Sequence, residues 1–98
     1  MTKDEILATL KSAEPELRAK GVARTALFGS RVRGDAGADS DIDIMVEIDP
    51  AAGLGLWEYV GVIDFIEEMF PTKVDVANRA SLKPHVRPSA ERDAVYAF

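Results

Sequence analysis

A chain of 98 residues provides one small domain, because a second independent hydrophobic core would need more residues. The absence of cysteine excludes disulfides and thiolate metal sites, and it fits a cytoplasmic protein. The formal net charge of −5 argues against a nucleic-acid partner, and the sequence contains neither a membrane-spanning apolar run nor a secretory signal.

Residues 3–20 are predicted to be helical. Thr2 followed by Glu5 has the form of a capping box, which places the first helical residue near Lys3. Pro15 predicts a kink or a restart, and Gly21 is typical of a helix C-terminus. Apolar side chains recur at helical spacing at Ile6, Leu7, Leu10, Ala13 and Leu17. We therefore expect this region to pack one apolar face against the rest of the domain.

Two strands are predicted on either side of a turn-rich segment. Residues 22–28 form the first strand, and residues 31–34 form a short helical start after the turn that follows it. Residues 35–40 have the composition of a loop, and residues 41–47 alternate with the period of a half-buried strand. On that strand Asp41 and Asp43 share one face, whereas Ile42, Ile44 and Val46 share the other.

The second half of the chain predicts one more amphipathic helix and one more strand. Apolar residues recur at three and four over residues 56–70, which we interpret as a helix with Trp57 on its core side. The alternative is that Trp57 is an exposed anchor for a partner, since tryptophan is enriched at binding hot spots. Residues 73–77 form a third strand, with Asp75 on the face opposite Val74 and Val76, and residues 91–98 form a short helix. The order predicts an α/β or α+β fold with a small mixed three- to four-stranded sheet and helices packed on one face.

Several familiar site signatures are excluded. A P-loop needs Lys-Ser where this chain has Asp35-Ala36, and an EF-hand calcium loop needs a glycine where it has Ile44. A nucleophilic Ser30 would need a base, and the only histidine, His85, lies far along the chain between two prolines.

What remains is a set of three aspartates that meet if the second and third strands are neighbours. Like charges on one sheet face repel, and a cation between them or open water relieves the repulsion. Carboxylates are hard oxygen ligands suited to Mg²⁺ or Mn²⁺. The residues concerned are Asp41, Asp43 and Asp75.

The Gly29-Ser30 turn provides the other half of the pattern. Its backbone amides, followed by a helix start, form a cradle for a phosphate group, and Arg31 or Arg33 adds positive charge there. A metal clamp facing a phosphate cradle suits phosphoryl or nucleotidyl transfer. Spacing alone leaves open a second interpretation, a solvated acidic edge without catalysis.

The segment G-S-R-V-R-G-D-A-G-A-D-S-D-I-D-I-M-V, residues 29–46, closely resembles the signature of the DNA polymerase β-like nucleotidyltransferase superfamily. The whole layout is similar to the minimal nucleotidyltransferases of bacteria and archaea. The resemblance implies a single minimal nucleotidyltransferase domain over residues 1–98 with the nucleotidyltransferase fold.

The resemblance also implies residue roles. The first two aspartates, Asp41 and Asp43, bind two divalent metals, and Asp75 completes one metal site and helps to activate the attacking hydroxyl. The backbone turn and its neighbours bind ATP, and the residues assigned to that role are Gly29, Ser30, Arg31, Arg33 and Ser40.

Minimal members of the family are typically antitoxins of small helical HEPN-type toxins. The resemblance therefore implies a Mg²⁺-dependent transfer of AMP from ATP to a hydroxyl, that of a tyrosine, on such a toxin. The alternative is a non-catalytic antitoxin that neutralises its partner by binding alone. The intact set of three aspartates favours the enzyme, because a pure binder does not need them.

Overall fold

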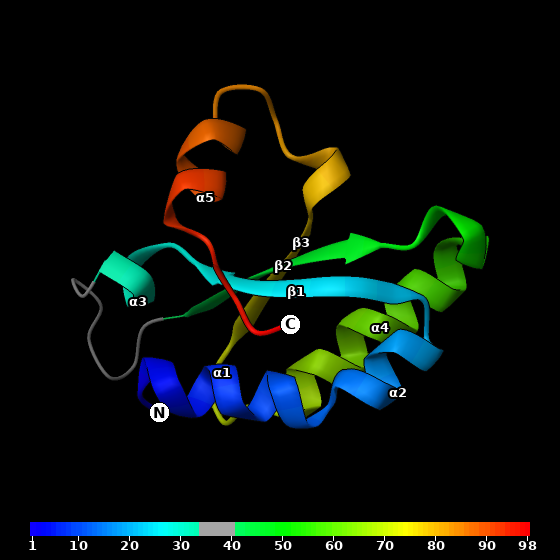
Figure 1. The fold of residues 1–98 in the computed structure, drawn as a ribbon, viewed down its shortest axis with the longest axis horizontal. Coiled ribbons are helices and arrows are strands. Elements are labelled where there is room, and N and C mark those ends of the chain that lie inside the picture. Colours follow the sequence, from blue (N-terminus) through cyan, green and yellow to red (C-terminus); the bar gives the residue numbers. More distant parts are fainter. Residues whose placement is uncertain (34–40) are drawn as a thin grey trace.

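The structure is a computed structural model that describes residues 1–33 and 41–98, with the backbone alone at Ser30. Helices, strands and short 3₁₀ turns follow one another along the chain (Figure 1). They are α1 (Lys3–Ser12), α2 (Glu14–Ala19), β1 (Val22–Phe28), α3 (Ser30–Arg33), β2 (Ile42–Ile48), η1 (Pro50–Ala52), α4 (Leu56–Glu68), β3 (Val74–Asn78), η2 (Arg79–Ser81), α5 (Arg87–Asp93) and β4 (Val95–Tyr96). Among the described residues, no helix is long and apolar enough to cross a membrane.

The helical start of the chain follows the predicted pattern. The capping box is present, with the Glu5 amide donating to Thr2 Oγ1 at 3.1 Å and the Thr2 amide donating to Glu5 Oε1 at 2.8 Å. Pro15 lies in the first turn of α2, where its missing N–H costs nothing, so it restarts the helix as predicted. Gly21, with a φ of 100°, turns the chain from α2 into β1.

The four strands form one mixed sheet in the order β3-β2-β1-β4. Strand β1 runs antiparallel to both β2 and β4, whereas β2 and β3 are parallel. Parallel neighbours need a long crossover, and α4 provides it. The predicted α/β fold with a small mixed sheet is confirmed, and the observed β2 and β3 begin one residue later than predicted.

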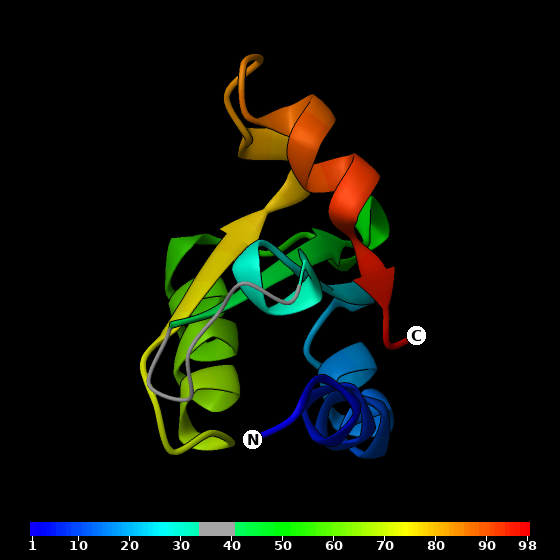
Figure 2. The ribbon, with the colours of Figure 1, turned by 90° about the vertical axis from the view of Figure 1, so that its left-hand side faces the viewer.

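The hydrophobic core lies between one face of the sheet and the three helices α1, α2 and α4, which occupy the same side in both views (Figures 1 and 2). The alternation in β2 is confirmed, since Ile42, Ile44 and Val46 are fully buried on this face. Their partners from the helices are Ile6, Leu10, Leu17, Val62 and Ile66.

Helix α5 lies on the opposite side of the sheet from those three helices (Figure 2). Ala26 and Met45, paired across β1 and β2, are fully buried. The predicted helix at residues 91–98 is wrong, because the helix spans Arg87–Asp93 and the chain then pairs with β1 as β4. Pro88, in the first turn of α5, favours this earlier start.

Trp57 corrects a second prediction, because its side chain is 81% exposed and does not belong to the core. Helix α4 buries Val62 and Ile66, which are four residues apart. Trp57 lies on another stripe, together with Gly61 and Asp64, which are also exposed.

Candidate active site

Three strand ends meet at one end of the sheet. Because β2 and β3 are parallel and β1 is antiparallel to β2, the last residues of β1 lie beside the first residues of β2 and β3. Asp43 is paired with Phe28 on one side and with Asp75 on the other. The register therefore brings the Gly29 turn and two of the predicted aspartates together, and Asp41 comes directly before β2.

Asp43 is the most constrained of the three carboxylates. Its side chain is partly buried, and the loss of solvation raises the pKa of the Asp43 carboxyl. The negative charges of Asp75 and Asp41 raise this pKa further, whereas the charge of Arg33 lowers it. The three aspartates therefore share one electrostatic environment, in which the ionised form of Asp43 is disfavoured until positive charge arrives.

Gly29 lies directly against this carboxylate. Its φ of 81° is in the left-handed region, which favours glycine. A Cβ at position 29 would overlap Oδ2 of Asp43 and lie 3.2 Å from its Cγ. The Gly29 carbonyl accepts from the amides of Val32 at 3.1 Å and Arg33 at 3.3 Å, which starts α3. The turn thus needs glycine for its backbone conformation and also for its contact with Asp43.

Lys73 is a member of this cluster that sequence reasoning missed. Its Nζ lies 3.8 Å from Asp41 Oδ2 and 3.9 Å from Asp75 Oδ1. The lysine precedes Asp75 by two residues, so strand alternation puts both on one face, and this spacing was the available signal. With 70% of its side chain exposed, Lys73 is an accessible counter-charge and not a buried one.

Of the other predicted nucleotide-binding residues, Arg31 and Arg33 bind groups of the chain itself. Arg31 Nη1 donates to the Met1 carbonyl at 2.8 Å, and Arg33 Nη1 pairs with Asp93 Oδ2 of α5 at 3.0 Å. The Ser30 backbone begins α3, but its side chain and the whole of Ser40 lie outside the described residues. Their assignments to nucleotide binding remain predictions.

The donor set fits a hard divalent cation in its chemistry. Three carboxylates supply oxygen ligands, and the like charges around Asp43 create a demand for positive charge. Within residues 1–33 and 41–98, no three His, Cys, Asp or Glu side chains are gathered closely enough to hold a metal ion as they stand. The side chains of Asp41 and Asp75 are 47% and 53% exposed, so solvent surrounds much of both carboxylates and leaves room to reorient.

Comparisons with known proteins find relatives over nearly the whole chain. The family model described as "Nucleotidyltransferase domain" matches residues 5–97. The chain is 38% identical to Putative protein adenylyltransferase MJ1379 of Methanocaldococcus jannaschii, covering 97% of each chain. It is 33% identical to Protein adenylyltransferase MntA of Thermococcus cleftensis, covering 98% of this chain and 96% of the relative.

Solved structures show the same fold. A structure described as a "putative minimal nucleotidyltransferase" superposes with a TM-score of 0.69 at 27% identity, covering 97% of this chain and 95% of that one. A toxin–antitoxin structure with AMP-PNP gives a TM-score of 0.67 at 20% identity, covering 90% of this chain and 72% of that one, and it supports the fold alone. With the family model matching nearly the whole chain, this protein belongs to the nucleotidyltransferase domain family and is a nucleotidyltransferase.

Proposed function

We propose that the protein is a Mg²⁺-dependent antitoxin that transfers AMP from ATP to a tyrosine hydroxyl of a HEPN-type toxin. The observation that carries the proposal is the placement of Asp43 opposite Asp75, with the Gly29 turn against Asp43, in a nucleotidyltransferase domain. Relatives named protein adenylyltransferase support AMP as the transferred group and a protein as the acceptor.

In this proposal the Gly29 and Ser30 backbone amides hold the triphosphate, because amides in the first turn of a helix lack intrahelical partners. The partner's hydroxyl oxygen attacks the α-phosphorus of ATP. A new O–P bond forms, the bond to the α,β-bridging oxygen breaks, and pyrophosphate leaves with that electron pair. Asp75 lies beside the incoming hydroxyl and accepts its proton.

Asp41, Asp43 and Asp75 would hold the divalent metal. When bound, Mg²⁺ neutralises charge on the phosphates and lowers the pKa of the attacking hydroxyl. Lys73 Nζ lies 3.8 Å from Asp41 and 3.9 Å from Asp75, so a bound divalent cation would compete with this lysine for the same two carboxylates. A cation held there would also offset the surroundings that raise the pKa of Asp43, because a positive charge favours the ionised carboxylate.

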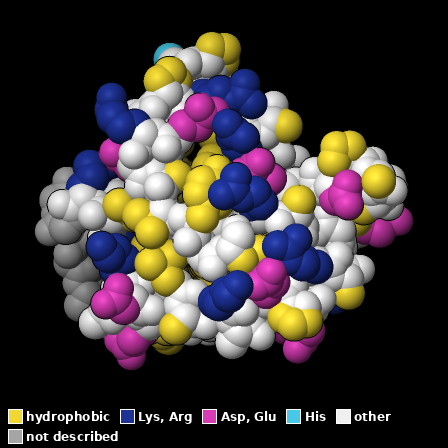
Figure 3. All heavy atoms as spheres, viewed as in Figure 1, with side chains coloured by type: hydrophobic (Ala, Val, Ile, Leu, Met, Phe, Trp, Pro, Cys, Tyr) yellow, Lys and Arg dark blue, Asp and Glu magenta, His cyan; other side chains and the backbone are white. Residues whose placement is uncertain are grey.

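A protein acceptor suits the charge of this chain better than a nucleic acid does. The net charge is −5, and on the face shown in Figure 3 basic and acidic side chains are interspersed instead of forming a continuous basic track. A negatively charged phosphate backbone therefore finds no extended complementary surface there.

The experiment incubates the protein with α-labelled ATP, Mg²⁺ and the purified product of the neighbouring reading frame. Label is expected on a tyrosine of the partner, and Asp41→Asn, Asp43→Asn and Asp75→Asn should each stop the transfer. Transfer of label to RNA, or no transfer by the wild type with Mg²⁺ or Mn²⁺ present, would overturn the proposal.

The alternative function is neutralisation by binding alone. The observation that favours it is the apolar surface at the start of α4, where Leu56 is 71% exposed and Trp57 is 81% exposed. Toxin inhibition that survives all three aspartate substitutions would support the alternative, whereas inhibition that is lost with them requires catalysis.

A further inference from the structure

Helix α4 presents an unpartnered outer stripe. Trp57, Gly61, Asp64 and Glu68 follow one another at helical spacing, and all four are exposed. Leu56, beside the tryptophan, is 71% exposed. Large apolar side chains that remain in water on a small domain mark a surface that another molecule covers.

Gly61 provides a second, independent observation. Glycine inside a helix destabilises it relative to alanine, so an interior helical glycine needs a reason. No reason exists within the described part of the chain, because a Cβ at Gly61 would meet nothing within 4 Å. One turn from an exposed tryptophan, a missing side chain leaves a notch that lets another backbone approach closely.

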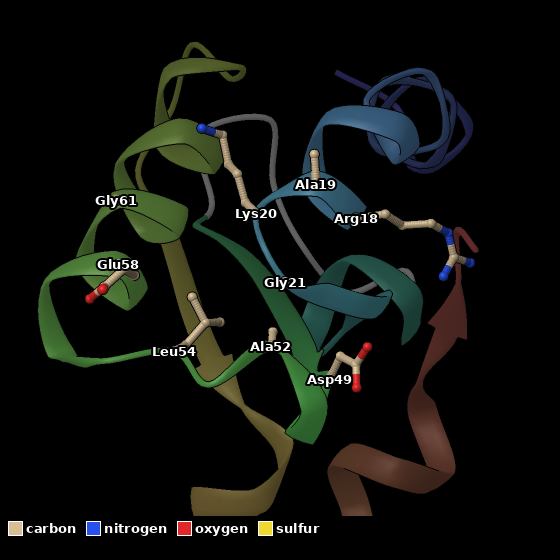
Figure 4. Close-up of a pocket in the computed structure, with 9 residues that line it drawn as sticks. All are labelled: Arg18, Ala19, Lys20, Gly21, Asp49, Ala52, Leu54, Glu58 and Gly61. Carbon is tan, nitrogen blue, oxygen red and sulfur yellow. The ribbon is translucent and has the colours of Figure 1, made fainter.

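The notch opens onto a hollow of about 550 Å³ at the far end of the sheet from the aspartates. Figure 4 shows Gly61 and Glu58 on α4 across from Ala19 and Lys20, with Leu54 and Ala52 between them. The basic residues of this hollow are engaged within the chain, since Arg18 pairs with Glu14 at 2.7 Å and Lys20 Nζ lies 4.9 Å from the centre of the Phe65 ring.

Charge indicates what kind of partner fits. Helix α4 contains four carboxylates, at Glu58, Asp64, Glu67 and Glu68, and no lysine or arginine. Two of these carboxylates lie in the last turn, where the helix dipole is itself negative and favours cations. A partner that supplies basic side chains there would relieve repulsion that the chain does not relieve within the helix.

We infer that the outer stripe of α4 docks a basic amphipathic helix of the toxin, with Trp57 inserted into its apolar seam and its backbone closest at Gly61. Basic side chains of that helix face Asp64 and Glu68. A second copy of this chain fits poorly, because its own α4 brings four more carboxylates and no lysine or arginine to pair with them. The inference rests on the proposed function for the existence of the partner, but it assigns the docking to α4, which covers the face of the sheet opposite the one that Asp43 occupies.

The test measures binding of the wild type and its variants to the purified toxin by titration calorimetry. Trp57→Ala is expected to weaken binding by about 30-fold or more, as for a central aromatic hot spot. Gly61→Leu should weaken it as well while favouring the helix. Asp64→Lys with Glu68→Lys should also weaken binding, whereas two equally charge-changing substitutions elsewhere, Asp4→Lys with Glu16→Lys, should not.

Two further readouts separate this inference from the proposed function. Mg²⁺–ATP is expected to raise the melting temperature, because a ligand that binds the folded state stabilises it. This rise should be unchanged in the α4 variants, since none of them alters Asp41, Asp43 or Asp75. Trp57 is the only tryptophan, so 5-fluorotryptophan gives one ¹⁹F resonance, which should shift when the toxin is added.

Each outcome is decisive for one of the two claims. Label transfer with unchanged affinity in every α4 variant would overturn the docking site and leave the proposed function standing. Binding that depends on Trp57 and Gly61 without label transfer would support the docking site and defeat the adenylylation. No binding of the toxin by the wild type, or a wild-type dimer that Trp57→Ala makes monomeric, would also overturn the docking site.

Discussion

The two ends of strand β2 differ in what they expose. At its start, Asp43 is held against Gly29 and opposite another carboxylate, so the ionised side chain is destabilised by its surroundings. Just past its end, Asp49 serves local structure, with Oδ1 accepting from the Ala51 amide at 2.9 Å, and α4 begins nearby with the exposed apolar side chains of Leu56 and Trp57. We therefore propose different tasks for the two ends: chemistry where a carboxylate is electrostatically destabilised, and docking where large apolar side chains are exposed.

The largest expected effect on nucleotide transfer is at the start of β2, which we call the aspartate end. Asp43→Asn should reduce nucleotide transfer by at least about 100-fold, because a group that stabilises developing charge is typically worth that much. The same variant should melt at a higher temperature than the wild type in EDTA, since it removes a disfavoured buried charge. Label transfer and thermal melting, measured on the same preparations, check the two expected results. An Asp43→Asn variant that transfers nucleotide at the wild-type rate would show that the aspartate end is not the site of the chemistry.

Gly29→Val should come next, with a loss of transfer and a stability cost of about 1–3 kcal/mol, as for a strained backbone position. Gly53→Val is the matched control, because Gly53 also has a positive φ, 61°, but a Cβ there would meet nothing within 4 Å. Chemical denaturation should find both variants destabilised, and only Gly29→Val should lose Mg²⁺–ATP binding. Equal binding losses would mean that the contact with Asp43 is irrelevant.

The pH dependence of stability should show a smaller effect. The folded pKa of Asp43 is raised, so between the ordinary value of 3.8 and the raised value the folded state binds more protons than the unfolded state. Stability should therefore fall as pH rises through this interval, and the deficit should persist above it. Denaturation in EDTA should show the advantage of Asp43→Asn over the wild type growing with pH, and a constant difference would contradict the electrostatic origin.

The smallest effect on stability is expected at the start of α4, near the end of β2. Trp57→Ala should change the free energy of unfolding by no more than about 0.5 kcal/mol, as for most surface substitutions. Ile66→Ala, in the same helix but fully buried, should cost about 2–5 kcal/mol. Urea denaturation of the two variants makes the comparison. A large loss in the free energy of unfolding for Trp57→Ala would show that Trp57 packs in the core.

The sequence predicted the strands well because alternation is a local signal with a strong physical cause. Ile42, Ile44 and Val46 could face the core only if Asp43 faced away, and the register then followed from the adjacent parallel strand. Strand β4 was missed because its two residues pair with Ala26 and Leu27, far away in the chain, and carry no local periodicity of their own.

Trp57 was assigned to the wrong side of its helix because apolar spacing was counted without the polar residues. Asp64 lies seven positions after Trp57, on the same stripe, and a charged residue there indicates a solvent-facing side. The role of Lys73 is not readable from spacing alone, because its contact with Asp41 depends on the pairing of β2 with β3. The chemistry of the aspartate end was thus readable from the sequence, but the surroundings of those side chains depended on tertiary packing.

The length of strand β2 sets the distance between the two ends of the sheet. Six residue steps separate Asp43 from Asp49, which at about 3.3 Å per step amounts to roughly 20 Å. A partner anchored at the far end that delivers a hydroxyl to the near end must bridge this length, equal to about 13 residues of α-helix. On the proposed docking, a partner too short to span this length would be held or modified, but not both at once.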